Sequence, residues 1–197
     1  MTIRKGEPWG EAVAAPAGLL IVESDAAARV SVLAGARTIG LAHGDLARTM
    51  GGGARGRFEG EVVRAPVDLL RVTANGDSTL AVAHVVARRS WWRGQVVVAM
   101  NAQFLGRYDV APRSHPNDAR VDVMTVAAAM PLRKRIQARR RAITGTHLPH
   151  PQLTMIQVGE HRVEFVRPLT LWVDGVKWRR ATGFEVHVEP DALTILA

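Results

Sequence analysis

Apolar residues recur at a helical interval in the first sixty residues of the chain and at a strand interval after them. A short apolar run at 19–23 precedes a segment at 24–35 whose apolar positions lie on one helical face. Ser24 can cap this helix, and Gly35 can end it. The pattern therefore predicts a strand and a helix, with a second short helix within 44–53.

From residue 61 onward, runs rich in valine, leucine and threonine alternate between apolar and polar positions. A period of two is typical of strands that are buried on one face. Asn75-Gly76 separates two such runs and predicts a two-residue hairpin, because both positions of a type I′ turn need positive φ. Further antiparallel strands are predicted towards the C-terminus, joined by turns at Gly159-Glu160, Asp174-Gly175, Gly183 and Pro190-Asp191.

Together these patterns predict a mainly β protein with a few helices, organised in two parts. Residues 1–60 would form an irregular arm, at 1–17, and a short α/β remnant. Residues 61–197 would form an antiparallel β-sandwich, because short strands with regular turns are typical of that architecture. Exposed edges of such a sandwich favour a homodimer, since edge strands are usually paired or covered.

One helix is predicted inside the sandwich part, at about 130–145. Its apolar residues Leu132, Ile136 and Ile143 fall on one stripe. The other faces of the helix are almost entirely cationic. Cationic side chains bind phosphate groups, so the helix is a candidate for contact with an anionic surface through Arg133, Lys134, Arg139 and Arg140.

Composition narrows the classes of partner and site. The formal charge of +8 favours anionic partners, which include phosphorylated small molecules, nucleic acid and an acidic membrane surface. The absence of cysteine excludes disulfides, thiolate zinc sites and cysteine nucleophiles. No run approaches about 18 uninterrupted apolar residues, and no signal sequence is evident. We therefore expect a cytoplasmic protein whose contact with a membrane, if any, is peripheral.

The loop at 111–126 is rich in proline and carries two carboxylates, Asp118 and Asp122, at the start of a predicted strand. Carboxylates and loop carbonyls are the ligands that Mg²⁺ prefers, so this loop is a candidate magnesium site. The same spacing also occurs in ordinary acidic turns, and the residues alone do not choose between the two.

Several fragments, taken in order, match one family. They are GDLARTMG at 44–51, VDLLRV at 67–72, NAQFLGRYDVAPRSHPNDARVDVMTV at 101–126, RRAITGTHLPHP at 140–151, LWVDG at 171–175 and VEPDALTILA at 188–197. In this order they resemble the diacylglycerol kinase-like lipid kinases, relatives of the NAD kinases. The resemblance implies a C-terminal β-sandwich and an N-terminal lobe that binds ATP through a Gly-Gly-Asp-Gly-Thr loop. This sequence lacks that loop, so we expect most of the ATP lobe to be absent.

The resemblance also implies site residues, and the chain departs from the family at several of them. The Thr-Gly-Asn-Asp of the family becomes Ala42-His43-Gly44-Asp45, and its Asp-Asp-Gly-x-Leu-Asp becomes 117–122, which keeps two of three carboxylates. The Asp-Gly-Glu of the family becomes Asp174-Gly175-Val176. The resemblance implies that this glutamate is the general base that takes the proton from the acceptor hydroxyl. Valine has no group that can accept a proton.

The resulting hypothesis is a non-catalytic lipid-kinase-like protein. A cleft next to the arginine-rich helix would bind a phosphorylated or lipid ligand, or a partner protein, through Asp45, Arg48, Asn101, Asp118 and Asp174. A second hypothesis is an active lipid or nucleotide kinase that uses ATP and Mg²⁺, takes its ATP lobe from a partner chain and has Asp174 or His43 as base. A third, less favoured, is a nucleic-acid-binding module that uses ARRSWWRG at 87–94 and the arginine-rich helix.

Overall fold

The computed structural model describes residues 9–52, 58 and 60–197. Its N-terminal elements are β1 (Glu11–Ala14), β2 (Ile21–Val22), α1 (Asp25–Leu33), β3 (Thr38–Leu41) and α2 (Asp45–Thr49). Both predicted helices are confirmed, and the Ser24 hydroxyl caps α1 by accepting a hydrogen bond from the Ala27 N–H at 3.2 Å. The arm is only partly as predicted. Residues 1–8 lie outside the described residues, but 11–14 form a strand that pairs with 61–64.

The remaining elements are mostly strands. They are β4 (Glu61–Ala74), β5 (Asp77–Ala81), β6 (His84–Arg88), β7 (Val96–Met100), β8 (Phe104–Leu105), β9 (Tyr108–Asp109), β10 (Val121–Val126), β11 (Leu153–Val158), β12 (Glu160–Val173) and β13 (Val176–Leu196). Helix α3 (Leu132–Arg141) and the 3-10 turn η2 (Ala142–Thr144) lie between β10 and β11.

One main sheet contains all of these strands except the β8–β9 hairpin, and its central order is β1-β4-β13-β12-β6-β7-β10-β11. Neighbours on this path are antiparallel, whereas β2–β3 and β3–β13 are parallel. The Asn75-Gly76 and Asp174-Gly175 hairpins are confirmed, with φ of 51° and 84° in the first and 48° and 79° in the second. The predicted antiparallel β-rich fold class is therefore correct.

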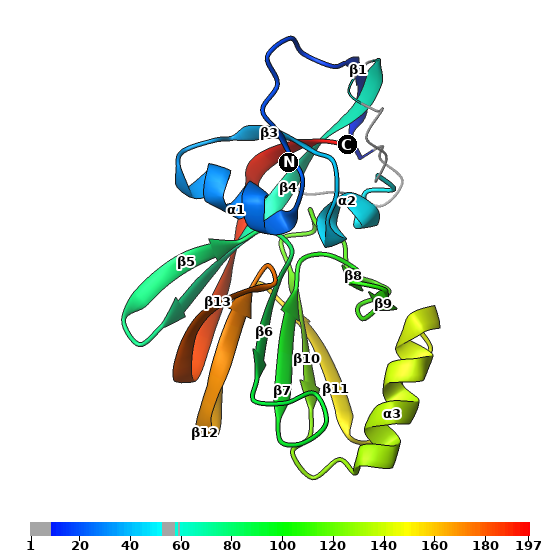
Figure 1. The fold of residues 1–197 in the computed structure, drawn as a ribbon, viewed down its shortest axis with the longest axis vertical. Helices are drawn as coiled ribbons and strands as arrows, with labels where there is room; N and C mark the ends of the chain where they lie inside the picture. Colours follow the sequence, from blue (N-terminus) through cyan, green and yellow to red (C-terminus); the bar gives the residue numbers. More distant parts are fainter. Residues whose placement is uncertain (1–8, 53–57, 59) are drawn as a thin grey trace.

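Three apolar clusters hold the fold together. Figure 1 shows the strands and helices around which they form. The largest is shared by β4, β12 and β13 with β6, β7 and β10, which are the two halves of the bent sheet. A second lies between the N-terminal helices and the ends of β4 and β13. The third covers the other face of β6, β7 and β10. Strand β7 is buried along its whole length because its two faces belong to different clusters.

Two predicted turns are wrong, because β13 continues through both Gly183 and Pro190-Asp191. At Gly183 a Cβ atom would lie 2.5 Å from the Val163 carbonyl oxygen, so glycine is needed for the close approach of β12. At Pro190-Asp191 the pairing of β13 with β4 shifts register between Glu189 and Leu193. Bulges use the same residue types as turns, which is why the sequence pattern predicted chain reversals there.

Helix α3 turns its apolar stripe outward. The predicted helix is present, and Leu132, Ile136 and Ile143 are 53%, 37% and 43% exposed. The face turned towards the sheet instead carries Arg135, which is 5% exposed, and the half-buried Arg139. No α-helix among the described residues is long and apolar enough to cross a membrane.

Candidate functional site

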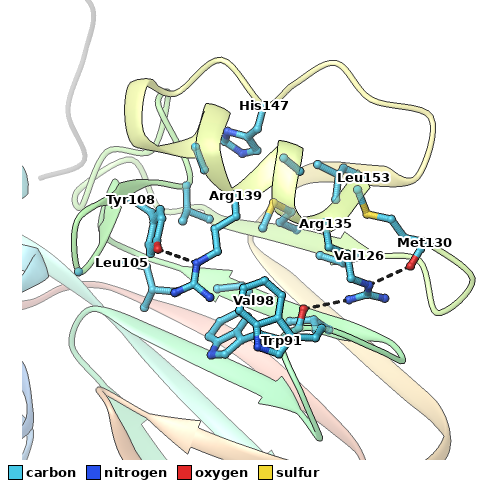
Figure 2. Close-up of a pocket in the computed structure, with 17 residues that line it drawn as sticks. Trp91, Val98, Leu105, Tyr108, Val126, Met130, Arg135, Arg139, His147 and Leu153 are labelled. Carbon is cyan, nitrogen blue, oxygen red and sulfur yellow. Dashed lines mark hydrogen bonds between the residues drawn. The ribbon is translucent and has the colours of Figure 1, made fainter. Parts of the chain in front are cut away.

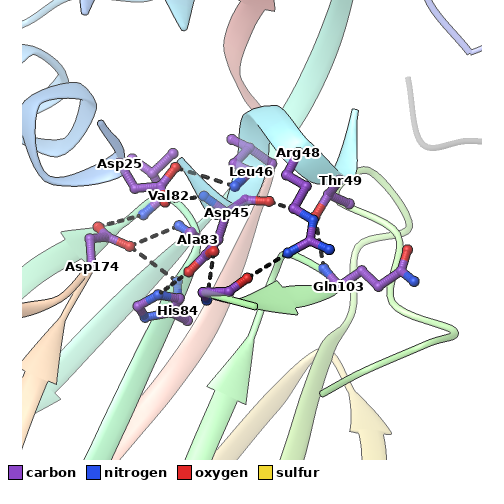
Figure 3. Close-up of polar contacts among 11 residues, drawn as sticks. Asp25, Asp45, Leu46, Arg48, Thr49, Val82, Ala83, His84, Gln103 and Asp174 are labelled. Carbon is purple, nitrogen blue, oxygen red and sulfur yellow. Dashed lines mark hydrogen bonds and ion pairs between the residues drawn. The ribbon is translucent and has the colours of Figure 1, made fainter. Parts of the chain in front are cut away.

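Four polar side chains meet where the N-terminal helices contact the sandwich, and we call them the Asp25 cluster: Asp25, Asp45, His84 and Asp174 (Figure 3). Asp25 and Asp45 are the first residues of α1 and α2, and His84 is the first residue of β6. Asp174 lies in the turn between β12 and β13. The fold thus brings together residues that are far apart in the sequence.

Asp174 acts as a backbone acceptor. Its carboxylate oxygens accept hydrogen bonds from the N–H groups of Val82, Ala83 and His84 at 3.0, 2.9 and 3.1 Å. The Arg29 Nε atom lies 3.9 Å from Asp174 Oδ2, and the Asp174 side chain is fully buried. Through these three hydrogen bonds Asp174 fixes the turn that leads into β6, and its role as a base stays a prediction.

Asp25 and Asp45 connect the two N-terminal helices to His84. The Asp25 carboxylate accepts from the N–H of Asp45 at 2.6 Å and from the N–H of Leu46 at 3.3 Å, which satisfies the start of α2. Gly44, with φ of 127°, precedes this contact, and a Cβ atom there would lie 2.4 Å from Asp25 Oδ1. Asp45 Oδ2 lies 3.0 Å from His84 Nε2.

Burial sets the protonation of this cluster. It raises the pKa of Asp25 to about 7, and the neighbouring Asp174 adds to the rise. It also raises the pKa of Asp174, although His84 and three backbone N–H groups oppose it. Burial alone lowers the pKa of His84, but the hydrogen bond to Asp45 and the charges of Asp174, Asp45 and Asp25 together raise it. The Asp25 cluster therefore keeps a proton near neutral pH, where a carboxylate in water would have lost it.

The cluster also holds the β8–β9 hairpin in place. Asp45 Oδ1 accepts a hydrogen bond from the Gly106 N–H at 2.8 Å, and Arg48 Nη1 donates to the Gly106 carbonyl at 2.7 Å. The Arg48 guanidinium also stacks on Phe104, 4.0 Å from the ring centroid. Helix α2 thereby fixes the turn of the hairpin.

The other predicted ligand-binding residues are not members of this cluster, although Asn101 borders it through Val82, whose N–H group binds Asp174. Asn101 is buried and donates to the carbonyls of Asp68 and Val82 at 2.8 and 2.9 Å. Asp118 lies in the acidic loop. His43, the alternative base, is an exposed residue whose Nε2 is 3.7 Å from Glu23 Oε2. The structure thus brings Asp45, Arg48, Asn101 and Asp174 near one another, whereas Asp118 lies in the acidic loop.

The acidic loop is held by hydrogen bonds within the loop and to the neighbouring strands β4 and β11. Asp118 accepts from the N–H of Arg120 and from Gln157 Nε2, both at 3.0 Å. Burial raises the pKa of Asp118 to about 6. Within the described part of the chain, no group of three or more histidine, aspartate or glutamate residues is arranged to hold a metal ion. The magnesium site at Asp118 and Asp122 stays a prediction.

A cavity of about 310 Å³ lies between α3 and the outer face of β7 and β10 (Figure 2). Its walls are largely apolar, and the β8–β9 hairpin closes one side with Leu105, Gly106 and Tyr108. The lining residues most relevant here are Trp91, Trp92, Val98, Met124, Ala138 and Arg139. Gly106 in this wall is held by Asp45 of the Asp25 cluster and by the neighbouring Arg48.

Two arginines of α3 line the cavity but differ in their contacts. Arg135 is fully engaged, since it donates to the carbonyls of Trp91, Gly94, Ala127 and Met130. Arg139 donates through Nε to the Tyr108 hydroxyl at 2.6 Å and stacks on Trp92. Among the described residues, its two terminal nitrogens have no hydrogen-bond partner and no acidic residue forms an ion pair with it. The cavity therefore contains one cation that is available to a ligand.

A family model described as "YegS C-terminal NAD kinase beta sandwich-like domain" matches residues 62–197, which is most of the chain. The chain belongs to this family. The resemblance inferred from the sequence fragments is thereby confirmed. The search of curated proteins finds no match to the chain.

Several solved structures are similar to this YegS-type chain. A diacylglycerol kinase from Bacillus anthracis str. Sterne has a TM-score of 0.58 at 14% identity and covers 80% of this chain and 66% of its own. Two putative diacylglycerol kinases from the same organism have TM-scores of 0.64 and 0.60 at 11% and 12% identity. They cover 90% and 80% of this chain and 77% and 69% of their own. At such identities the likeness shows the fold, and this chain spans just under two thirds of the first structure.

Sequence reasoning missed two members of the cluster in this YegS-type domain. Asp25 had the pattern of an ordinary acidic residue in a first helical turn. His84 offered a usable signal, because it is the one polar residue in AVAHVVA at 81–87, where every residue is buried. An isolated polar residue in such a run needs a buried partner, and here the partner is Asp45.

Proposed function

We propose that this chain binds one amphiphilic molecule, with an apolar chain and an anionic group, in the cavity under α3 and does not transfer phosphate to it. The observation that carries the proposal is the pairing of an apolar cavity with the unpaired terminal nitrogens of Arg139. Apolar walls with a few well-placed polar groups are typical of small-molecule sites. An anionic group at Arg139 would gain charge-assisted hydrogen bonds without displacing a carboxylate.

The size of the cavity restricts the ligand. Its volume of about 310 Å³ is at the lower end of ligand sites, which span roughly 300–1000 Å³. This favours a single-chain amphiphile, such as a fatty acid or a lysophospholipid, over a lipid with two chains. Tyr108 and Trp92, which hold the Arg139 guanidinium between them, orient it at the wall.

The absence of phosphoryl transfer rests on the turn after β12. Val176 stands where the family resemblance implies a glutamate base, and it has no group that can accept a proton. Asp174, the other candidate base at this turn, already accepts three backbone hydrogen bonds. A binding function needs neither residue as a base, because the proposed cavity lies on the far side of the β8–β9 hairpin.

Ligand binding is tested with oleate and 1-oleoyl lysophosphatidic acid as anionic probes and with uncharged monoolein, all as monomers. We expect both anionic probes to change the fluorescence of the tryptophans that line the cavity. Arg139→Gln should weaken the binding of the anionic probes by about tenfold, because it removes a charge-assisted contact, and should leave monoolein unaffected. Arg140→Gln, an exposed neighbour on the same helix, is the charge control.

A second pair of variants tests the location. Ala138→Phe places a ring in the cavity and should abolish binding of all probes, whereas Gln137→Phe adds the same bulk on the exposed side of α3. Equal loss in both variants, or unchanged binding in Ala138→Phe, would contradict the cavity as the site. Far-UV circular dichroism and the melting temperature check that each variant is folded.

Transfer of phosphate is tested with radiolabelled ATP, Mg²⁺ and diacylglycerol in mixed micelles. We expect no labelled phosphatidic acid above background. Val176→Glu, which restores a carboxylate at this position, is the matched variant. Transfer by the unmodified chain would support the alternative of an active lipid kinase, while transfer by Val176→Glu alone would show that only the base is missing.

A further inference from the structure

Helix α3 has its apolar stripe on the outside, and nothing in the described part of the chain covers it. Leu132 and Ile136 in α3 and Ile143 in η2 are each more than a third exposed. An aliphatic stripe exposed to water costs free energy that burial would recover. The stripe is not needed to attach the helix to the rest of the fold, because Arg135 on the inward face does so through hydrogen bonds to four backbone carbonyls.

Cations flank this stripe. Successive residues of an α-helix are about 100° apart, so Arg133 and Arg140 project to one side of the stripe and Arg139 projects to the other. The sequence of α3, LRKRIQARRR, has no acidic residue. Arg133, Lys134 and Arg140 are exposed, and they form no ion pair within the ranges that the structure describes.

We propose that α3 and η2 lie on an anionic membrane surface, with Leu132, Ile136 and Ile143 inserted at the level of the headgroups and Arg133 and Arg140 in contact with lipid phosphates. A helix with an aliphatic stripe between cationic residues has the chemistry of an interfacial helix. Trp92 lies in the wall of the cavity next to α3, where Arg139 stacks on it. Its side chain is 45% exposed, and an aromatic side chain of this kind is suited to the same interface.

The stripe is what favours a membrane over nucleic acid. Proteins that bind single-stranded nucleic acid combine cations with aromatic rings on which bases stack. Aliphatic side chains between the cations gain nothing from phosphates or bases, whereas the acyl region of a membrane buries them. The inference deepens the proposed function, since it names the membrane as the source of the ligand, but the helix can bind a membrane even if the cavity binds nothing.

The test is co-sedimentation with vesicles of phosphatidylcholine alone and with vesicles in which part of it is replaced by phosphatidylserine. We expect binding to the second and little to the first, with binding reduced by high salt. Arg133→Gln/Arg140→Gln should weaken binding by about tenfold or more, because each cation near an anionic surface contributes about 1 kcal/mol. Arg167→Gln/Arg180→Gln removes the same charge from exposed positions on β12 and β13 and should bind as the unmodified chain does.

Leu132→Ser/Ile136→Ser tests the stripe without changing the charge. It should weaken binding to anionic vesicles severalfold and leave the dependence on salt intact. Because both residues are exposed, the variant is expected to fold normally, which its melting temperature verifies. If this variant binds anionic vesicles as well as the unmodified chain does, the aliphatic side chains do not contribute to membrane binding and the proposal is overturned.

Two further outcomes separate this inference from the proposed function. Ala138→Phe should still bind vesicles, so a loss of vesicle binding in that variant alone would place the contact in the cavity and overturn the role of α3. Retained vesicle binding without binding of monomeric probes would refute the proposed function only.

The nucleic-acid alternative has its own outcome. If the chain binds a single-stranded RNA through Arg133 and Arg140 and does not bind anionic vesicles, the proposed membrane contact is wrong and nucleic acid is the partner of α3.

Discussion

Replacing Asp174 by alanine is expected to lower the free energy of unfolding by about 3 kcal/mol. The change leaves the N–H groups of Val82, Ala83 and His84 buried without an acceptor, and each such group costs about 1–3 kcal/mol. Relief of the buried negative charge offsets part of this loss. The loss of a β-turn residue with φ of 48° adds to it, because alanine disfavours positive φ. Urea denaturation measures the difference.

Asp174→Asn is the matched variant. Asparagine accepts through one oxygen and tolerates positive φ, so we expect about half the effect of alanine. Glu164→Ala, whose side chain is 77% exposed, is the surface control and should change stability by less than about 0.5 kcal/mol. An asparagine variant as stable as the unmodified chain would mean that the buried charge, and not the three hydrogen bonds, dominates at this turn.

Stability is expected to fall as the pH rises from about 5 to about 8. The pKa of Asp25 is raised from 3.8 to about 7, so the folded state binds more protons than the unfolded state across that interval, and stability decreases with pH. A shift of this size corresponds to at most about 4 kcal/mol, at 1.36 kcal/mol for each unit. His84, whose pKa is also raised, contributes stability below about pH 6.5 that is lost as the pH rises through its folded value.

Asp25→Asn separates this contribution from the others. The amide keeps one acceptor for the Asp45 N–H but does not titrate. We therefore expect the variant to be less stable than the unmodified chain at pH 5 and at least as stable at pH 8, with a shallower pH profile. Thermal melts across this range provide the measurement, and Glu164→Gln should keep the original slope. An unchanged slope in Asp25→Asn would show that Asp25 does not carry the pH dependence.

Local signals in the sequence predicted local structure well. The Asn75-Gly76 and Asp174-Gly175 turns have the positive φ values that their residue types favour. Ser24 caps α1 through a hydrogen bond that spans three residues. Such features depend on neighbours in the chain, which is why the alternation of apolar residues and the turn residues were sufficient to predict a β-rich fold.

Features that depend on distant contacts were not predictable in the same way. The pairing of Asp45 with His84 joins residues 39 positions apart, and no local pattern marks Asp45 as its partner. The orientation of α3 could not be predicted from its apolar stripe, because the rule that apolar faces point inward assumes that the interior offers only apolar partners. Here the loops around Arg135 offer four carbonyls, so a guanidinium replaces an aliphatic side chain.

Strand β13 has a consequence for the order in which the protein can fold on the ribosome. Its residues 184–188 complete the central cluster, and its residues Leu193 and Ile195, with Ala197 directly after the strand, complete the cluster under the N-terminal helices. Val63 and Ala197 exchange backbone hydrogen bonds of 3.0 and 3.1 Å. The central cluster therefore stays incomplete until residue 188 has been synthesised, and the cluster under the N-terminal helices until residue 197. Until then β4 can pair with β1 and β5 but lacks β13, its longest partner strand, and we expect chaperones to contact the nascent chain during that time.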